Sequence, residues 1–298
     1  PLACMGIFIV LIGWGIISGN RRKLQYLPPK VTIEGHGIKR GLTAVEAAIL
    51  LEEQLDKVMT MILFSVIKKN AAEVVSRDPL DIKSITPLPD TLHPYEIDFM
   101  NAFKESGSTR QKELRDMIVT LVRTVSEKMS GFSRRETIAY YRDITRRAWE
   151  QVEAAETPEV KSQKYEEVMD WTMLDRDYED RTRDVFQRQP VFIPTWWGRF
   201  DPAFGHSSVP KTAISPTSVS RVPGADFAAS VVTGVETFSS KVVGNITDFT
   251  SKITSVTNPA PKYTSSSSSS GTRSGGGCAC ACACACAGCA CACAGGGR

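Results

Sequence analysis

Apolar residues in the middle of the chain recur every three or four positions, as they do along the buried face of an α-helix. Over residues 108–131 this spacing is followed by Leu114, Ile118, Leu121, Val125 and Met129. Sequences typical of a capping box, Ser-x-x-Gln and Ser-x-x-Glu, mark Ser108 and Ser133 as helix starts. Pro94 suits a first helical turn, and a last helix is predicted from Thr157 to about Phe186. We therefore expect a helical bundle over residues 91–187.

The residues before this bundle predict a small α+β module over residues 42–90. The stretch "GLTAVEAAILLE" starts a helix with a capping box at Thr43 and Glu46. An almost wholly apolar helix is predicted from about Leu55 to Lys69, with Asn70 as its stop. Two short strands follow, "AAEVVS" and "LDIKSI", joined by the turn "RDP". Two helices and a two-stranded ribbon follow the plan of a winged helix, so the module is predicted to be winged-helix-like.

The second helix of this module does not have the composition of a DNA-reading helix. Reading DNA requires polar and basic side chains along the exposed face of that helix. Its central stretch "VMTMILFSVI" is apolar, and the bases of the helix are Lys57, Lys68 and Lys69. We therefore expect the helix to be buried in a larger helical assembly, and we do not expect nucleic acid as a partner.

The start of the chain predicts the compartment. Residues 2–20 carry no charge, and "LACMGIFIVLIGWGII" is apolar enough to lie in a lipid bilayer. The bases Arg21, Arg22 and Lys23 follow this run, whereas the bases of a signal peptide precede it. By the positive-inside rule we predict a single-pass protein of the cell membrane, with the residues after 20 in the cytoplasm. A transmembrane helix over residues 1–20, truncated at its start, and a connector over residues 21–41 are expected; a buried core helix and a crude fragment boundary are the alternatives.

The order of these elements resembles that of a known family. A membrane span, a basic flank, "GLTAVEAAILLE", "VIKKN", "AAEVVSRDP" and "LHPYEIDFMNAF" follow one another over roughly residues 2–155. This order is similar to that of a family of predicted bacterial membrane proteins with a domain of unknown function. The resemblance implies a membrane helix, a winged-helix-like cytoplasmic region and a low-complexity tail, and it implies no activity. The family's extracellular domain and the charged helix after Thr157 do not match between the two.

A long apolar stripe lies in the second half of the chain, beyond a linker over residues 188–223. Residues 224–257 are predicted to form an amphipathic segment whose apolar positions advance by three or four. We expect it to lie on the membrane surface through Phe227, Val231, Val235, Phe238, Val242, Ile246, Phe249 and Ile253. Docking on the protein's own helices or on a partner, and persistent disorder, are the alternatives. In the linker, Trp196 and Trp197 fit a local aromatic cluster better than an interfacial contact.

The end of the chain is of low complexity and is expected to be disordered. A Ser- and Gly-rich spacer covers residues 258–277, and a Cys-Ala repeat covers residues 278–298. The repeat contains Cys278, Cys280, Cys282, Cys284, Cys286, Cys289, Cys291 and Cys293. Because cytoplasmic thiols stay reduced, these residues are candidate ligands for a soft metal, Zn²⁺ or Cu(I). Reversible acylation and an inert repeat are the alternatives.

Composition and motifs contain no sign of an enzyme. The formal net charge is +3, and the three histidines His36, His93 and His206 lack the spacing of a metal pair. No phosphate loop, dinucleotide fingerprint or nucleophile elbow is present in the sequence. The expected fold is therefore mainly α, with a membrane helix, a winged-helix-like module, a helical bundle and a disordered tail with one amphipathic helix. The expected function is a non-enzymatic interaction or scaffold module at the cytoplasmic face of the membrane, with an unknown protein partner. Soft-metal binding or thiol-based sensing by the tail is the alternative.

Overall fold

A computed structural model of the chain describes residues 25–28, 35–77, 80–186, 190–192, 194, 196–201, 221–223 and 242–259. The chain divides into two units, residues 1–260 and 261–298, and all described residues belong to the first. The predicted membrane segment 1–20, the linker residues 202–220 and the Cys-Ala repeat lie outside the described residues. Among the residues that are described, no helix has the length and the apolar character needed to cross a bilayer.

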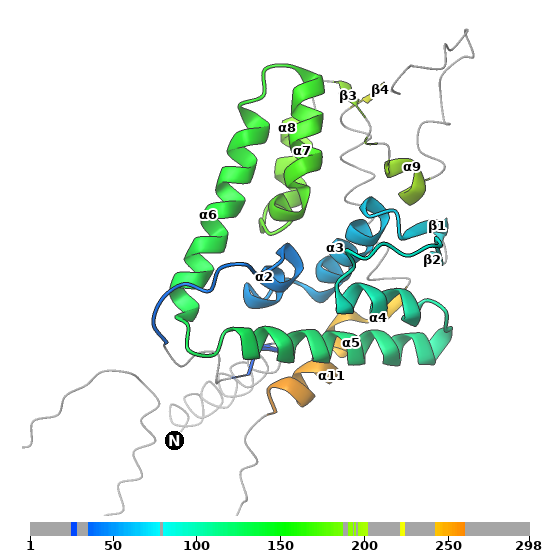
Figure 1. Cartoon of the computed structure of the whole chain (residues 1–298), viewed down its shortest axis with the longest axis vertical. Coiled ribbons are helices and arrows are strands. Elements are labelled where there is room, and N and C mark those ends of the chain that lie inside the picture. The colour runs from blue at the N-terminus through cyan, green and yellow to red at the C-terminus, as the bar shows by residue number, and fades with distance from the viewer. Residues whose placement is uncertain are drawn as a thin grey trace, which may run out of the picture. The chain divides into compact units, whose positions relative to one another are not determined.

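The described part is mainly helical with a small two-stranded sheet (Figure 1). Its elements are α2 (Ala44–Leu50), α3 (Leu55–Lys68), β1 (Ala72–Arg77), β2 (Leu80–Ser84), α4 (Pro94–Ala102), α5 (Gly107–Lys128), α6 (Arg134–Glu153), α7 (Pro158–Thr172), α8 (Tyr178–Phe186), β3 (Pro190–Phe192), α9 (Trp197–Phe200), β4 (Arg221–Pro223) and α11 (Ile246–Thr257). Strands β1 and β2 pair antiparallel from Ala72 opposite Ser84 to Arg77 opposite Leu80, with an irregularity between Val74 and Ser76. Strands β3 and β4 form a second, very short antiparallel pair.

Helix α3 lies at the centre of the hydrophobic core. Eleven of its 14 residues are buried, including Val58, Phe64 and Ile67, each with 0% exposure. Helices α2, α4, α9 and α11 all contact it. A helix that is apolar around most of its circumference must be covered on all sides, and these neighbours provide the cover. The expectation that α3 is buried in a larger helical assembly is therefore confirmed, and residues 42–90 and 91–187 share one core.

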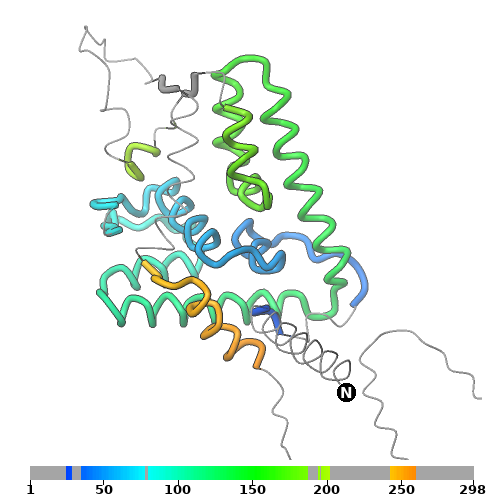
Figure 2. Tube along the Cα trace, turned by 180° about the vertical axis from the view of Figure 1, so that it is seen from behind, coloured from blue at the N-terminus to red at the C-terminus, as the bar shows by residue number. Residues whose placement is uncertain are grey.

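Four further helices of the described part pack in two pairs. Helices α4 and α5 lie side by side, as do α6 and α7 (Figures 1 and 2). The amphipathic pattern of α5 places Leu114, Ile118 and Val125 in the core, each with 0% exposure. On α6, Trp149 and Val152 are buried in the same way. For α5, the face that the apolar spacing predicts to be buried is therefore the face that packs.

Several helix boundaries follow the signals in the sequence. The capping box of α2 is present, because the Thr43 hydroxyl accepts from the Glu46 backbone N–H and the Glu46 carboxylate accepts from that of Thr43. Asn70 adopts a positive φ of 59° directly after α3, which is the left-handed conformation of a helix stop. Gly131 has a φ of 81° after α5, where glycine carries no steric penalty. The predicted capping box of Thr43 and Glu46 and the predicted stop at Asn70 are confirmed.

Two predicted boundaries are wrong. Helix α5 begins at Gly107 with Ser106 in the N-cap position, so Ser108 lies inside the first turn and cannot cap it. The helix expected to run from Thr157 to Phe186 is interrupted after Thr172 and resumes at Tyr178. The interruption has a packing reason, because Met173 and Leu174 are buried in the turn and Tyr178 returns to contact Tyr165. A straight helix would have carried Tyr178 away from that contact.

The amphipathic segment is described only over residues 242–259. There its apolar side faces the protein, because α11 packs on α5 and α3. Val242 and Phe249 are each 5% exposed, Ile253 is 0% exposed, and Ile246 packs against the same core. The prediction that these four residues lie on a membrane surface is therefore wrong. They pack against the core that α5 and α3 form with the rest of the protein. Phe227, Val231, Val235 and Phe238 lie outside the described residues.

Candidate functional site

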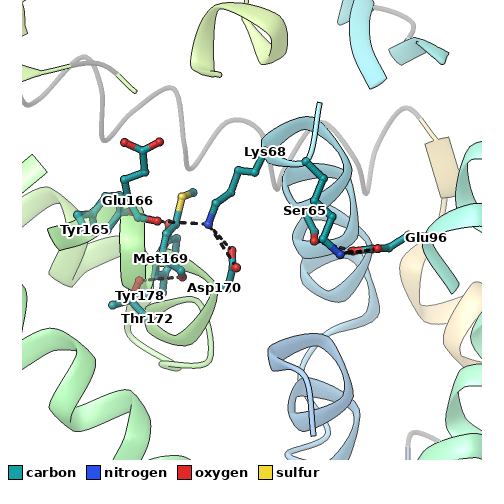
Figure 3. Close-up of polar contacts among 10 residues, drawn as sticks. Ser65, Lys68, Glu96, Tyr165, Glu166, Met169, Asp170, Thr172 and Tyr178 are labelled. Carbon is teal, nitrogen blue, oxygen red and sulfur yellow. Dashed lines mark hydrogen bonds and ion pairs between the residues drawn. The ribbon is translucent and has the colours of Figure 1, made fainter. Parts of the chain in front are cut away.

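The carboxylate of Glu96 is the most deeply buried acid of the described fold, with 0% of the residue exposed. It lies in the first turn of α4, where its oxygen accepts from the His93 backbone N–H at 2.7 Å. The Ser65 hydroxyl of α3 donates to it at 2.6 Å, and the Lys69 ammonium lies 2.7 Å away. Figure 3 shows Ser65 and Glu96 pointing toward each other between the two helices. A buried charge is tolerated when it is paired and hydrogen-bonded in this way.

The neighbouring Lys68 points to the opposite side of α3. Its ammonium lies 3.2 Å from the Asp170 carboxylate and donates to the Glu166 carbonyl of α7 at 3.2 Å (Figure 3). Two consecutive lysines at the end of α3 therefore hold α4 on one side and α7 on the other. Cations at a helix C-terminus are also favoured by the helix dipole.

A second buried acid repeats the Glu96 arrangement. Glu46 is 4% exposed, completes the capping box of α2 and accepts from the Lys128 ammonium of α5 at 2.5 Å. The Tyr95 hydroxyl donates to the Thr43 hydroxyl at 3.2 Å and so links the starts of α4 and α2. Because these carboxylates cap helices and pair with lysines, their chemistry is structural: they fix where α2, α3, α4 and α5 meet.

Two tyrosines form a buried polar contact between α7 and α8. The hydroxyls of Tyr165 and Tyr178 lie 2.6 Å apart, and each residue is 1% exposed. Burial disfavours the phenolate, so the pKa of Tyr165 is raised to about 12 and that of Tyr178 is raised well above its ordinary value. Both hydroxyls therefore stay protonated at neutral pH and act as hydrogen-bonding groups.

Trp196 and Trp197 lie in an aromatic cluster on α3. Their ring centroids are 5.8 and 5.7 Å from that of Phe64, and the Phe200 ring meets Phe64 edge-on at 4.9 Å. Arg77 of β1 pairs with Asp201 at 2.5 Å and covers Phe200, which ties the cluster to the ribbon. With 3% and 0% exposure the two tryptophans are buried, as the prediction of a local aromatic cluster requires.

A recess with several charged lining residues lies between α5 and α11. Two adjoining hollows, of about 350 and 500 Å³, share Arg115 and Lys252 as lining residues. The charged residues of the two hollows are Lys112, Arg115, Asp116, Arg123, Asp248 and Lys252. We call this recess the α5–α11 groove. Four bases against two acids give it a surplus of positive charge.

No sequence pattern predicts the groove, because its two walls are far apart in the chain. Lys112 and Lys252 come together only when the apolar side of α11 docks on α5. The Glu96 site, in contrast, had a local signal, since His93-Pro94-x-Glu96 has the spacing of a capping sequence with proline at the first helical position. The partner Lys69 had no such signal.

The structure does not test the predicted metal ligands of the tail. The cysteines from Cys278 to Cys293 lie outside the described residues. Within the described ranges, no group of three or more His, Cys, Asp or Glu residues is placed to hold a metal ion. His36 and His93 lie in separate places: the backbone N–H of His36 donates to Gly131, and the His93 ring stacks on Tyr95.

Comparison with known proteins gives no match to any family model, curated protein or solved structure. The resemblance to bacterial membrane proteins therefore stays a prediction from the sequence.

Proposed function

We propose that the chain is a single-pass membrane-anchored interaction module whose helical body lies at the cytoplasmic face of the membrane. One observation carries the proposal. The residues that follow the predicted membrane segment are built into the body: Tyr26 and Leu27 are 2% and 4% exposed, and the Tyr26 hydroxyl donates to the Glu53 carbonyl at 2.9 Å. Residues 25–28 are fixed in the core, and they lie only a few residues along the chain from the predicted membrane segment.

The end of the described chain contacts these same residues. The Thr257 hydroxyl at the end of α11 donates to the Tyr26 carbonyl at 2.5 Å, and the Asn258 amide donates to the Gln25 carbonyl at 3.0 Å. The predicted anchor and the C-terminal tail are therefore joined to the described body at one place. Such an arrangement suits a scaffold, which needs a fixed body rather than a reactive centre.

Residues 42–90 follow a winged-helix-like plan, but their bases do not favour nucleic acid as the partner. The three bases of α3 and its C-cap pair with carboxylates: Lys57 with Glu53 at 3.2 Å, Lys68 with Asp170 and Lys69 with Glu96. A helix that reads DNA offers such bases to phosphates and base edges instead. We therefore propose protein as the class of partner, with the bilayer as the anchor.

The anchor is tested by placing charge in the apolar segment of the full chain. An arginine at the centre of a membrane helix costs about 2.5 to 3.5 kcal/mol. We expect V10R/I12R to move the protein from the alkali-resistant membrane fraction to the supernatant, whereas V10L/I12L stays in the membrane. The described body should keep its helicity in both. Extraction of the unmodified chain by alkali would overturn the proposal, and cleavage of its tail by protease added outside intact cells would overturn the orientation.

A second candidate function rests on the eight clustered cysteines of the tail. We propose soft-metal binding, with Zn²⁺ or Cu(I) held by thiolates, as the alternative to a purely scaffolding role. Native mass of the chain isolated under reducing, anaerobic conditions should then show whole metal increments that a chain ending at Gly277 lacks. Acyl-sized increments would indicate a lipid-modified tail, and the mass of free thiols would remove the metal candidate.

A further inference from the structure

The α5–α11 groove brings several exposed bases without a carboxylate partner together in one recess of the described surface. Elsewhere, some exposed bases pair with carboxylates of their own helices, such as Arg146 and Lys164. Other exposed bases, such as Lys83 of β2 and Arg142 of α6, have no salt bridge within the described residues, but they lie on separate elements. Lys112, Arg123 and Lys252 are exposed, and within the described part of the chain none has a carboxylate within 4.0 Å. Their charges are available to an anion from outside.

The remaining charges of the groove reduce this surplus without cancelling it. Arg115 lies 3.3 Å from the Asp116 carboxylate, so these two neutralise each other in part. Asp248 lies in the first turn of α11, where its backbone N–H donates to the Asn245 side chain. The lining carries four bases, Lys112, Arg115, Arg123 and Lys252, and two acids, Asp116 and Asp248. Its net charge is therefore +2.

The position of the groove suggests the source of the anion. Ser255 and Val256 line its second hollow, and the residues after them, Thr257 and Asn258, bond to Tyr26 and Gln25. Gln25 follows the end of the predicted membrane segment by five residues, an extended reach of about 18 Å. Val256 is 49% exposed, so an apolar side chain stands beside the bases. Bases flanked by an exposed apolar residue are what a lipid surface with negative headgroups attracts.

We propose that the α5–α11 groove binds the phosphate groups of anionic phospholipids in the leaflet that anchors the chain. The inference rests on the proposed function, because the anchor brings this leaflet within reach. Lys112, Arg123 and Lys252 supply the charge, and Val256 contacts the edge of the acyl region. Binding at a groove made by two helices stabilises their contact, because a ligand that binds the closed form alone makes opening rarer. The bilayer thereby holds α11 on α5.

The test uses the full chain in nanodiscs of phosphatidylcholine, with or without phosphatidylglycerol, and follows hydrogen exchange of the α11 amides. One base near an anionic surface is worth about fivefold in an equilibrium constant. We expect α11 to exchange at least about fivefold more slowly with phosphatidylglycerol, and this protection to fall at high salt as screening increases. K112Q/R123Q/K252Q should lose the protection. K83Q/R142Q/R176Q removes the same charge from exposed positions that do not line the groove and should keep it.

Several outcomes would overturn the proposal. Equal exchange in the two kinds of nanodisc, or equal loss of protection in the two triple variants, would mean that the groove does not bind the lipid. Inorganic phosphate added to phosphatidylcholine nanodiscs supplies the same chemistry in soluble form. Full protection by this probe, with none from phosphatidylglycerol, would assign the groove to a soluble phosphate and refute the lipid.

A failure of the anchor gives a different result. A chain that does not insert remains outside the nanodiscs, which contradicts the proposed function and leaves the groove open to a direct test. Flotation of that chain with phosphatidylglycerol vesicles, reduced in K112Q/R123Q/K252Q and unchanged in K83Q/R142Q/R176Q, would still support the groove. No flotation of the unmodified chain would refute both.

Discussion

Replacing Lys69 by methionine removes the cation from a carboxylate that water does not reach. The Lys69 ammonium lies 2.7 Å from Glu96, whose side chain is 0% exposed, while the Lys69 side chain itself is 24% exposed. Breaking a buried ion pair by removing one partner costs about 3 to 5 kcal/mol. Water that enters beside Lys69, together with the bonds from His93 and Ser65, offsets part of this, so we expect K69M to cost about 2 to 3 kcal/mol. For a domain of this size the melting temperature should fall by about 5 to 10 °C.

A double-mutant cycle of Lys69 and Glu96 separates the coupling energy of the ion pair from the other effects of each substitution on stability. Glu96→Gln keeps acceptor oxygen for the His93 N–H and removes the charge. In K69M/E96Q no buried charge is left unpaired, so the double variant should melt above K69M, with a coupling energy of about 1 to 2 kcal/mol. The side chains differ in shape from the originals, which is why a cycle is required rather than a single comparison.

The assay is thermal unfolding of the full chain followed by tryptophan fluorescence, since Trp149, Trp196 and Trp197 are buried in the body. The matched control is Lys164→Met. Lys164 pairs with Glu167 at 2.8 Å on the exposed face of α7, with side chains 41% and 47% exposed. Exposed pairs of this kind contribute little, and we expect no resolvable change. Equal melting temperatures for K69M and K164M would refute the assignment of Glu96 as a buried charge held by Lys69.

Two further predictions concern the core. Phe64→Ala removes the ring on which Trp196, Trp197 and Phe200 pack, and should cost about 3 to 5 kcal/mol with a red shift of the folded-state tryptophan emission; an unchanged emission would mean that the cluster does not form. At alkaline pH the raised pKa values of Tyr165 and Tyr178 contribute stability that is complete below the ordinary tyrosine pKa of about 10 and is lost as the pH rises toward 12. Tyrosinate absorbance should therefore show that Tyr165 and Tyr178 ionise together with unfolding, as do other buried tyrosines such as Tyr26 and Tyr95, whose pKa burial also raises. Y178F should reduce the number of these tyrosines by one; ionisation of Tyr165 and Tyr178 near pH 10 in the folded protein would contradict their burial.

The sequence by itself determined several of the helix boundaries. The capping pair Thr43 and Glu46, the stop at Asn70 and the glycine at position 131 act on backbone groups a few residues away, so their effect is readable without a fold. The apolar spacing likewise identified the buried faces of α3 and α5. These signals are local because hydrogen bonds within a helix join residues three or four apart.

The tertiary structure decided which surfaces meet. The apolar stripe of α11 predicts that this side of the helix is covered, but it fits a bilayer and a neighbouring helix equally well. Only the packed fold shows that α11 lies on α5 and α3, with Phe249 and Ile253 buried. The pairs Lys69–Glu96 and Lys68–Asp170 join residues 27 and 102 positions apart, and the groove joins residue 112 to residue 252. Charge pairing and hydrophobic burial depend on distance in space and carry no sequence spacing of their own. For that reason several helix boundaries could be predicted from the sequence, while the break between α7 and α8, the buried ion pairs and the basic groove emerged only from the packing.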